Sequence, residues 1–230
     1  MTLPESLAGR LYVLGCRPDS GRAPAGAAAA LRLRAAVMAE LWLVGAAVPD
    51  GPRAASDPKG LVRPAGASHP DPVAAALFAE IAGRNKPRNW AWWVGHGERA
   101  TAQAVADQLA AAGTIQPVRS RRWGVFGRTD IALTEPADVA LLRAMVRETL
   151  LGPAPVADLD RRDVVLAALA VAGEIKPLWE RAERRAARDR LTELQAVAGP
   201  VPAALRKVIK DREATIAGAA TVAAVAASSG

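Results

Sequence analysis

The sequence predicts a mainly α-helical fold: a single helical domain around a central apolar helix, with one protruding β-hairpin. Apolar residues recur at helical spacing along most of the chain, and one basic stretch flanks a glycine-containing turn. Alanine and leucine are abundant in a hydrophobic fraction of 51%, which favours helix over sheet. Because 230 residues contain no linker long enough to divide them, we expect residues 1–230 to form one domain.

The first half of the chain is arranged around the central helix. Residues 7–13 alternate enough to form a short strand or a buried start of the fold, and residues 17–25 are a turn-rich loop. Residues 27–44 form a strongly apolar helix, which Gly45 ends and which we place at the centre of the core. Residues 48–68 are loop-like, with a weak signal for a pair of short strands.

Two clear helix signals follow. Asp71 and Pro72 are an N-cap and first-turn pair that begins one helix. Residues 98–112 form an amphipathic helix that ends at Gly113.

The second half is predicted to be helical throughout. Pro136 begins one helix, residues 163–173 form another, and residues 177–197 form a longer helix with a charged middle. A final alanine-rich helix covers residues 201–227.

A basic hairpin joins the two halves. Residues 118–123 and 130–133 flank a turn with a glycine at each end. Its arginines protect a solvated edge strand or contact an anion, and the sequence leaves both interpretations open.

Charge and cysteine content limit the classes of partner and compartment. A net charge of +7 and a pI of about 10.4 favour an acidic partner: a phospholipid surface, a nucleic acid or an acidic protein. Cys16 is the single cysteine, so the chain forms no internal disulfide, and this fits a reducing cytoplasm. We find neither a secretory signal nor an apolar run of about 18 residues, so a membrane role would be peripheral.

The sequence contains no catalytic arrangement that rises above background. His96 lies between two glycines but lacks the preceding strand and the Lys-Ser/Thr ending of a phosphate loop. His69 lies in a turn, and two isolated histidines do not form a zinc site. We therefore expect no enzyme activity, no metal and no cofactor.

Two arginines are candidate anion contacts. Arg34 lies on the otherwise apolar central helix, where burial without a partner would be costly, so it reaches either an acidic neighbour or a surface phosphate. Arg99 lies in the first turn of its helix, where free N–H groups already favour an anion. The cluster of Trp90, Trp92 and Trp93 fits core packing in a short extended segment better than base stacking or a membrane interface.

Several segments together resemble the Golgi phosphoprotein 3 family, whose members include a yeast vacuolar-sorting homologue and bacterial relatives. The similarity begins at residues 3–7 (LPESL) and continues through residues 31–48 (LRLRAAVMAELWLVGAAV). It recurs at residues 87–115 and in the hairpin, residues 121–136. The alanine-rich end, residues 205–227, is similar to bacterial members.

The resemblance implies a non-catalytic protein that binds phosphatidylinositol 4-phosphate at a membrane surface. Matched to the family's head-group site of one Trp and several Arg, Arg34 and Arg99 fall on two of the arginines. The wedging Trp falls on Ala25 and the remaining arginine on Ala102. We take Arg22 as a substitute cation near the lost Trp.

These observations predict a peripheral membrane adaptor of bacterial type, located in the cytoplasm at the inner face of the membrane. Its partner would be an anionic phospholipid head group. The resemblance also suggests a homo-oligomer formed through the hairpin, with these contact residues: Arg121, Arg122, Trp123, Phe126 and Arg128. The alternatives are a pure protein-interaction module and a winged-helix-like nucleic-acid binder, the latter disfavoured because residues 98–112 offer few base-reading side chains: Arg99, Thr101, Gln103 and Gln108.

Overall fold

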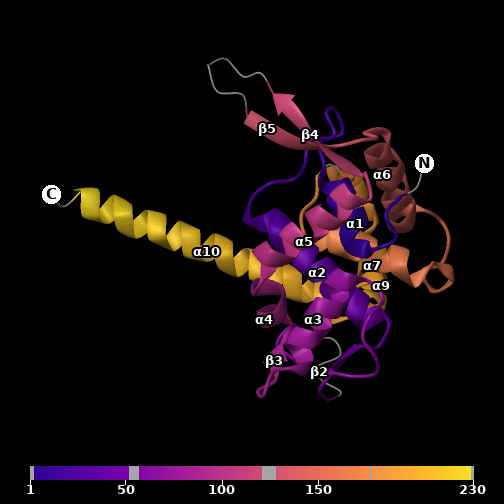
Figure 1. The fold of residues 1–230 in the computed structure, drawn as a ribbon, viewed down its shortest axis with the longest axis vertical. Coiled ribbons are helices and arrows are strands. Elements are labelled where there is room, and N and C mark those ends of the chain that lie inside the picture. Colours follow the sequence, from indigo (N-terminus) through magenta and orange to yellow (C-terminus); the bar gives the residue numbers. More distant parts are fainter. Residues whose placement is uncertain (1–2, 52–56, 121–127, 177, 229–230) are drawn as a thin grey trace.

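The computed structural model describes residues 3–51, 57–120, 128–176 and 178–228. Its helices are α1 (Leu7–Gly15), α2 (Ala27–Leu43), α3 (Pro72–Ala82), α4 (Trp90–Gly95), α5 (Glu98–Ala111), α6 (Ala137–Leu151), the 3-10 helix η2 (Val156–Asp158), α7 (Arg161–Ala172), α8 (Arg181–Ala186), α9 (Arg188–Ala198) and α10 (Pro200–Ser228). Its strands are β1 (Ala47–Pro49), β2 (Leu61–Pro64), β3 (Arg88–Asn89), β4 (Ile115–Ser120) and β5 (Arg128–Leu133). The mainly helical fold predicted from the sequence is confirmed (Figure 1).

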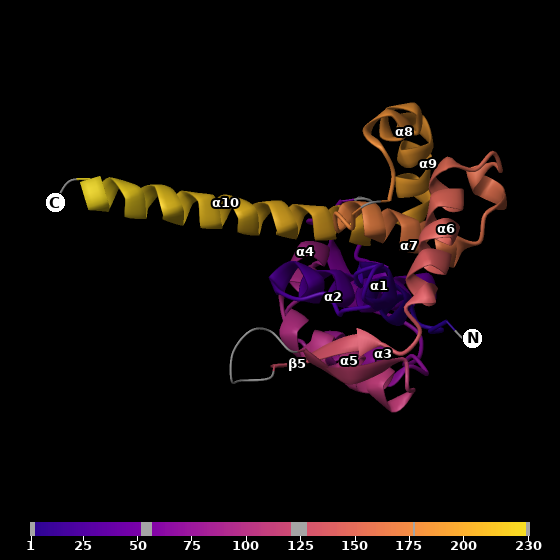
Figure 2. The same ribbon diagram turned by 90° about the horizontal axis from the view of Figure 1, so that it is seen from above.

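Helix α2 lies at the centre of the molecule, as its composition predicts. It packs against α1, α3, α4, α5, α7 and α10. Figure 2 shows α1 and α2 between a layer that contains α7 and α10 and a layer that contains α3 and α5. A helix that is apolar on every side must be covered on every side, and α2 is buried from Ala29 to Leu41 apart from the partly exposed Arg32.

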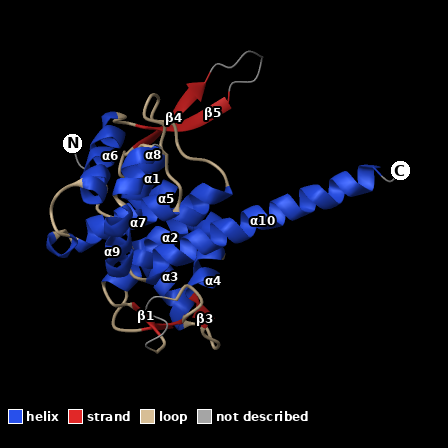
Figure 3. Cartoon of the chain, turned by 180° about the vertical axis from the view of Figure 1, so that it is seen from behind, coloured by secondary structure: helices blue, strands red, loops and turns tan. Residues whose placement is uncertain are grey.

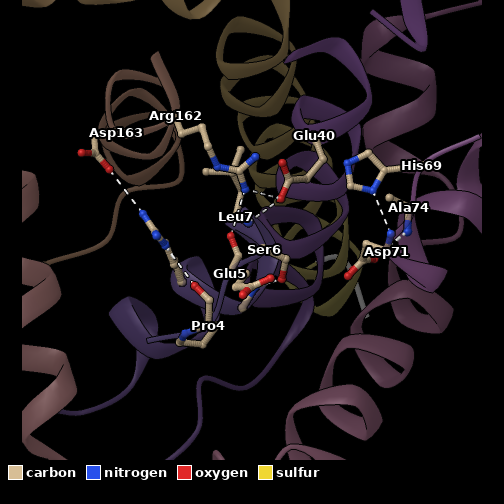
Figure 4. Close-up of polar contacts among 12 residues, drawn as sticks. Pro4, Glu5, Ser6, Leu7, Glu40, His69, Asp71, Ala74, Arg162 and Asp163 are labelled. Carbon is tan, nitrogen blue, oxygen red and sulfur yellow. Dashed lines mark hydrogen bonds and ion pairs between the residues drawn. The ribbon is translucent and has the colours of Figure 1, made fainter. Parts of the chain in front are cut away.

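Two charged residues are buried with the apolar side chains of α2. Arg34 and Glu40 are each only 2% exposed. A Glu40 oxygen accepts a 2.7 Å hydrogen bond from the backbone N–H of Leu7 and a 2.8 Å bond from Arg162 Nη2 (Figure 4). Arg162 also donates to the carbonyl of Glu5. One carboxylate therefore connects the start of α1 and the first turn of α7 to the central helix.

Two small antiparallel sheets lie at opposite ends of the molecule (Figure 3). Strands β1, β2 and β3 form the first, in that order. Strands β4 and β5 form the second, pairing Ile115 with Leu133 and Ser120 with Arg128. The hairpin is confirmed in its paired strands, which begin at Ile115 and Arg128, before the predicted starts at residues 118 and 130. Its turn lies outside the described residues.

Three local predictions differ from the structure. A strand at residues 7–13 is wrong, because Ser6 accepts the Gly9 N–H as an N-cap and begins α1. The extended tryptophan segment is wrong as well, since Asn89 caps the short helix α4. The single helix at residues 177–197 is two helices, α8 and α9, and α8 begins with a capping box between Glu180 and Glu183.

Replacing Glu40 with alanine should lower the free energy of unfolding by about 3 kcal/mol. The substitution leaves the buried N–H of Leu7 without an acceptor and removes the ion-pair partner of Arg162. Urea denaturation followed by circular dichroism measures this loss. Glu193→Ala, an exposed site on α9, is the matched control and should change little. A loss for Glu40→Ala as small as that of the control would contradict the central role of this carboxylate.

The thiol of Cys16 should be inert in the folded protein. Burial raises its pKa from 9.0 to about 12. Since the thiolate is the reactive form, alkylation near pH 8 should be much slower in native buffer than in urea. Between pH 9.0 and about 12 the unfolded thiol ionises while the folded one stays protonated, so this group lowers stability as pH rises. Equal alkylation rates with and without urea would show that Cys16 is accessible.

Candidate anion-binding site

An open cavity of about 830 Å³ lies beside the start of α2. Its wall combines the loop between α1 and α2, the first turns of α2, one face of α5 and strand β5. The lining residues are Tyr12, Arg17, Arg22, Ala23, Pro24, Ala25, Gly26, Ala29, Ala30, Leu33, Arg99, Ala102, Gln103, Ala106, Asp130 and Ile131. We call this space the α2 cavity. Its volume is in the range of sites that hold a small-molecule ligand or a head group.

The loop between α1 and α2, which lines the α2 cavity, is held against the hairpin. Gly21 accepts a hydrogen bond from Leu133 N at 2.9 Å, and Ala23 N donates to Ile131 O at 2.8 Å. Arg22, between them, pairs with Ala132 as a bridge. Gly21 has φ +60°, a left-handed conformation that glycine adopts at no steric cost. The backbone of the loop thus pairs with β5 through an isolated bridge, and this pairing holds Arg22 at the cavity wall.

The α2 cavity is cationic. Arg17, Arg22 and Arg99 line it and are exposed, and Asp130 is the one carboxylate among its lining residues. Asp130 Oδ2 is 3.7 Å from Arg22 Nη1, and the Arg22 side chain is still 47% exposed. Three guanidinium groups against one carboxylate leave a positive potential that favours an anion.

The N-terminus of α2 adds to this potential. Gly26 is the N-cap, and no side chain caps the helix there. The first backbone N–H groups of a helix carry partial positive charge and bind anions when no side chain occupies them. Gly26, Ala29 and Ala30 line the α2 cavity, so this helix end lies at its wall.

Arg34 lies elsewhere and is fully engaged with protein groups. Its guanidinium donates to Trp93 O at 3.1 Å, to Thr101 Oγ1 at 2.9 Å and to Glu80 Oε2 at 2.6 Å. These bonds connect α2 to α4, α5 and α3. Gly97, the N-cap of α5, packs directly on the guanidinium, since a Cβ there would lie 3.3 Å from Arg34 Cζ.

The predicted head-group residues are therefore divided between two places. Arg22 and Arg99 line the α2 cavity together with Ala25 and Ala102, which stand where the family resemblance expects a Trp and an Arg. Arg34 lines a separate cavity of about 640 Å³ between α3 and α5. Sequence reasoning missed Arg17, because only the fold of the loop places it beside Arg22.

The hairpin and tryptophan predictions have different outcomes. The contact residues Arg121, Arg122, Trp123 and Phe126 lie outside the described residues, and Arg128 begins β5 without a described side chain. The core interpretation of the tryptophans agrees with the structure at Trp90 and Trp93, which are 0% and 2% exposed.

Comparison with known protein families agrees with the resemblance found in the sequence. The sequence model of the Golgi phosphoprotein 3 (GPP34) family matches residues 7–212. The chain belongs to the Golgi phosphoprotein 3 family. A search of curated proteins found no match to it. The matched region includes α2, α5, the hairpin and every residue that lines the α2 cavity.

Two further properties of the described residues bear on the site. No helix within the described ranges has the length and apolar character needed to cross a bilayer. The same ranges hold no cluster of three or more His, Cys, Asp and Glu residues spaced to bind a metal ion.

Removing the Arg34 side chain should destabilise the fold. Arg34→Ala leaves Thr101 Oγ1 and the Trp93 carbonyl without their donor, and we expect a loss of about 3 kcal/mol in urea denaturation. Arg99→Ala removes the same charge from an exposed position and should unfold at nearly the wild-type urea concentration. Equal stability of the two variants would mean that the Arg34 contacts do not hold α3, α4 and α5 on α2.

Proposed function

We propose that this family member is a non-catalytic adaptor that binds an anionic phospholipid head group in the α2 cavity at a membrane surface. The observation that carries the proposal is the convergence of Arg17, Arg22 and Arg99 with the uncapped N-terminus of α2. A planar guanidinium offers paired donors that fit a phosphate, and a helix N-terminus adds backbone donors. A phosphoinositide such as phosphatidylinositol 4-phosphate, with phosphate on its inositol ring, suits such a cavity.

Binding of this kind would be mainly electrostatic. Ala25 is exposed and offers no aromatic side chain to insert among the lipids. Each basic residue near an anionic membrane surface contributes about 1 kcal/mol, and salt screens that contribution. The compartment that fits this proposal is the cytoplasm, with the protein at the inner face of the membrane.

In this proposal Arg34 is a positioning residue. It holds α5, the helix that carries Arg99, through its bond to Thr101, and it holds α4 through its bond to the Trp93 carbonyl. Direct phosphate contact by Arg34 stays a prediction, and its three bonds within the protein favour the positioning role.

The rival classes have less support. A winged-helix reading needs base-reading side chains on α5, but Thr101 is 7% exposed and bonded to Arg34. Gln108 donates to Asp71 Oδ2 at 2.7 Å and is also engaged. Self-association through the hairpin is compatible with lipid binding, since the paired strands extend away from the helical body (Figure 1).

Liposome sedimentation of Arg22→Ala/Arg99→Ala against wild type tests the head-group site. With about 1 kcal/mol lost at each residue, the variant should bind vesicles containing phosphatidylinositol 4-phosphate about thirtyfold more weakly. Arg184→Ala/Arg188→Ala removes the same charge from exposed positions on α8 and α9 and should bind like wild type. Neutral phosphatidylcholine vesicles should bind none of the three proteins.

A comparison with phosphatidylserine vesicles of equal surface charge distinguishes recognition of the phosphoinositide head group from general electrostatic attraction to an anionic surface. Preference for the phosphoinositide supports the cavity as a specific site, whereas equal binding to both lipids supports a non-specific cationic surface. The proposal is wrong if wild type binds neither anionic vesicle at low salt, or if the two double variants lose binding equally.

A further inference from the structure

A second cationic surface lies at the end of the molecule opposite the hairpin. Residues 57–64 and 83–89 meet there through the pairing of β2 with β3, in which Val62 faces Arg88. The Trp90 N–H also donates to Gly60 O at 3.2 Å and joins the two segments. They carry five exposed cations, which we call the β3 surface: Lys59, Arg63, Arg84, Lys86 and Arg88. Asp57 is the one acidic residue in these two segments.

Trp92 holds two of these cations in place. The Arg84 guanidinium carbon lies 4.3 Å from the centroid of the Trp92 ring, and that of Arg88 lies 5.1 Å from it. The His96 ring stacks on Trp92 at 4.0 Å. Cation–π contacts fix guanidinium groups that would otherwise be mobile, so less entropy is lost when they bind a ligand.

Two carboxylates that are close in sequence to these cations, Glu80 and Asp57, accept other hydrogen bonds. Glu80 lies four residues before Arg84, near the end of α3, and its carboxylate lies 2.6 Å from Arg34 Nη2. Asp57 accepts a 2.8 Å bond from the backbone N–H of Lys59. Among the described residues, no salt bridge neutralises any of the five cations of the β3 surface.

The chemistry of this surface fits an acidic peptide. Arginine side chains pair with carboxylates through two parallel hydrogen bonds. Leu61, 43% exposed on the same strand pair, offers an apolar contact for an aliphatic side chain. The Trp92 ring is already covered by His96 and the arginines, so it is not available for stacking with a nucleobase.

We propose that the β3 surface binds an acidic segment of a partner protein. The sheet of β1–β3 and the β4–β5 hairpin lie at opposite ends of the molecule, and the α2 cavity includes residues of β5 (Figures 1 and 3). The chain therefore presents two cationic sites that face different partners. An adaptor with this arrangement holds a membrane at one end and an acidic protein at the other.

Fluorescence anisotropy with a fluorescein-labelled peptide of alternating glutamate and leucine tests the β3 surface in the full-length chain. Arg84→Ala/Arg88→Ala should weaken binding at least about tenfold, because both fixed guanidinium groups are lost. Arg184→Ala/Arg188→Ala matches it in charge and in spacing along the chain, and it should bind like wild type. Unchanged urea denaturation of both variants confirms that they are folded.

Each outcome either supports the proposal or overturns it. Arg22→Ala/Arg99→Ala should retain peptide binding while losing vesicle binding, so the two proposals fail independently. The β3 proposal is overturned if wild type does not bind the peptide at low salt, or if both arginine pairs weaken binding equally. Displacement of the peptide by an equal concentration of duplex DNA would also overturn it, in favour of nucleic acid.

Discussion

The burial of two opposite charges on one apolar helix sets the arrangement of the whole fold. Helix α2 must be covered on all sides, yet it carries Arg34 and Glu40 into the core, each 2% exposed. A buried charge is tolerated only when it is paired and hydrogen-bonded, so the neighbours of each residue are determined by its chemistry. Glu40 accepts from α1 and from α7, whereas Arg34 donates to α3, α4 and α5.

The burial of Arg34 affects the α2 cavity indirectly, through the position of α5. Arg34 is not part of the cavity wall, but it fixes Thr101, two positions after Arg99 on α5. The part of the wall that the loop between α1 and α2 forms is positioned differently, by backbone hydrogen bonds of Gly21 and Ala23 with β5. The bond of Arg34 to Thr101 and the backbone pairing of the loop with β5 therefore help to place three exposed arginines around one helix N-terminus.

Much of this could be predicted from the sequence where one local signal dominates. The Asp71 cap, the composition of α2 and the alternation of the hairpin each depend on neighbouring residues, and each is present in the structure. The direction of Arg34 could not be predicted, because an all-apolar helix has no polar face by which to orient it. The place of Arg17 in the site could not be predicted either, because it depends on backbone pairing between its loop and β5, which is distant in the sequence. The boundary between α8 and α9 could not be predicted, because charged residues occur on both sides of it and no Gly or Pro marks it.

The departures from the family pattern have a consistent physical consequence. In the proposed head-group site, Ala25 and Ala102 would lack the aromatic wedge and the cation that the family resemblance implies, while Arg17 and Arg22 would supply charge from the loop. If the proposed lipid binding holds, the lack of an inserted ring would leave membrane attachment mainly electrostatic, and therefore sensitive to salt and to lipid composition. Attachment would then be rapid and reversible. A second cationic surface at the other end suits such a protein, because two weak contacts made together hold a complex more strongly than either alone.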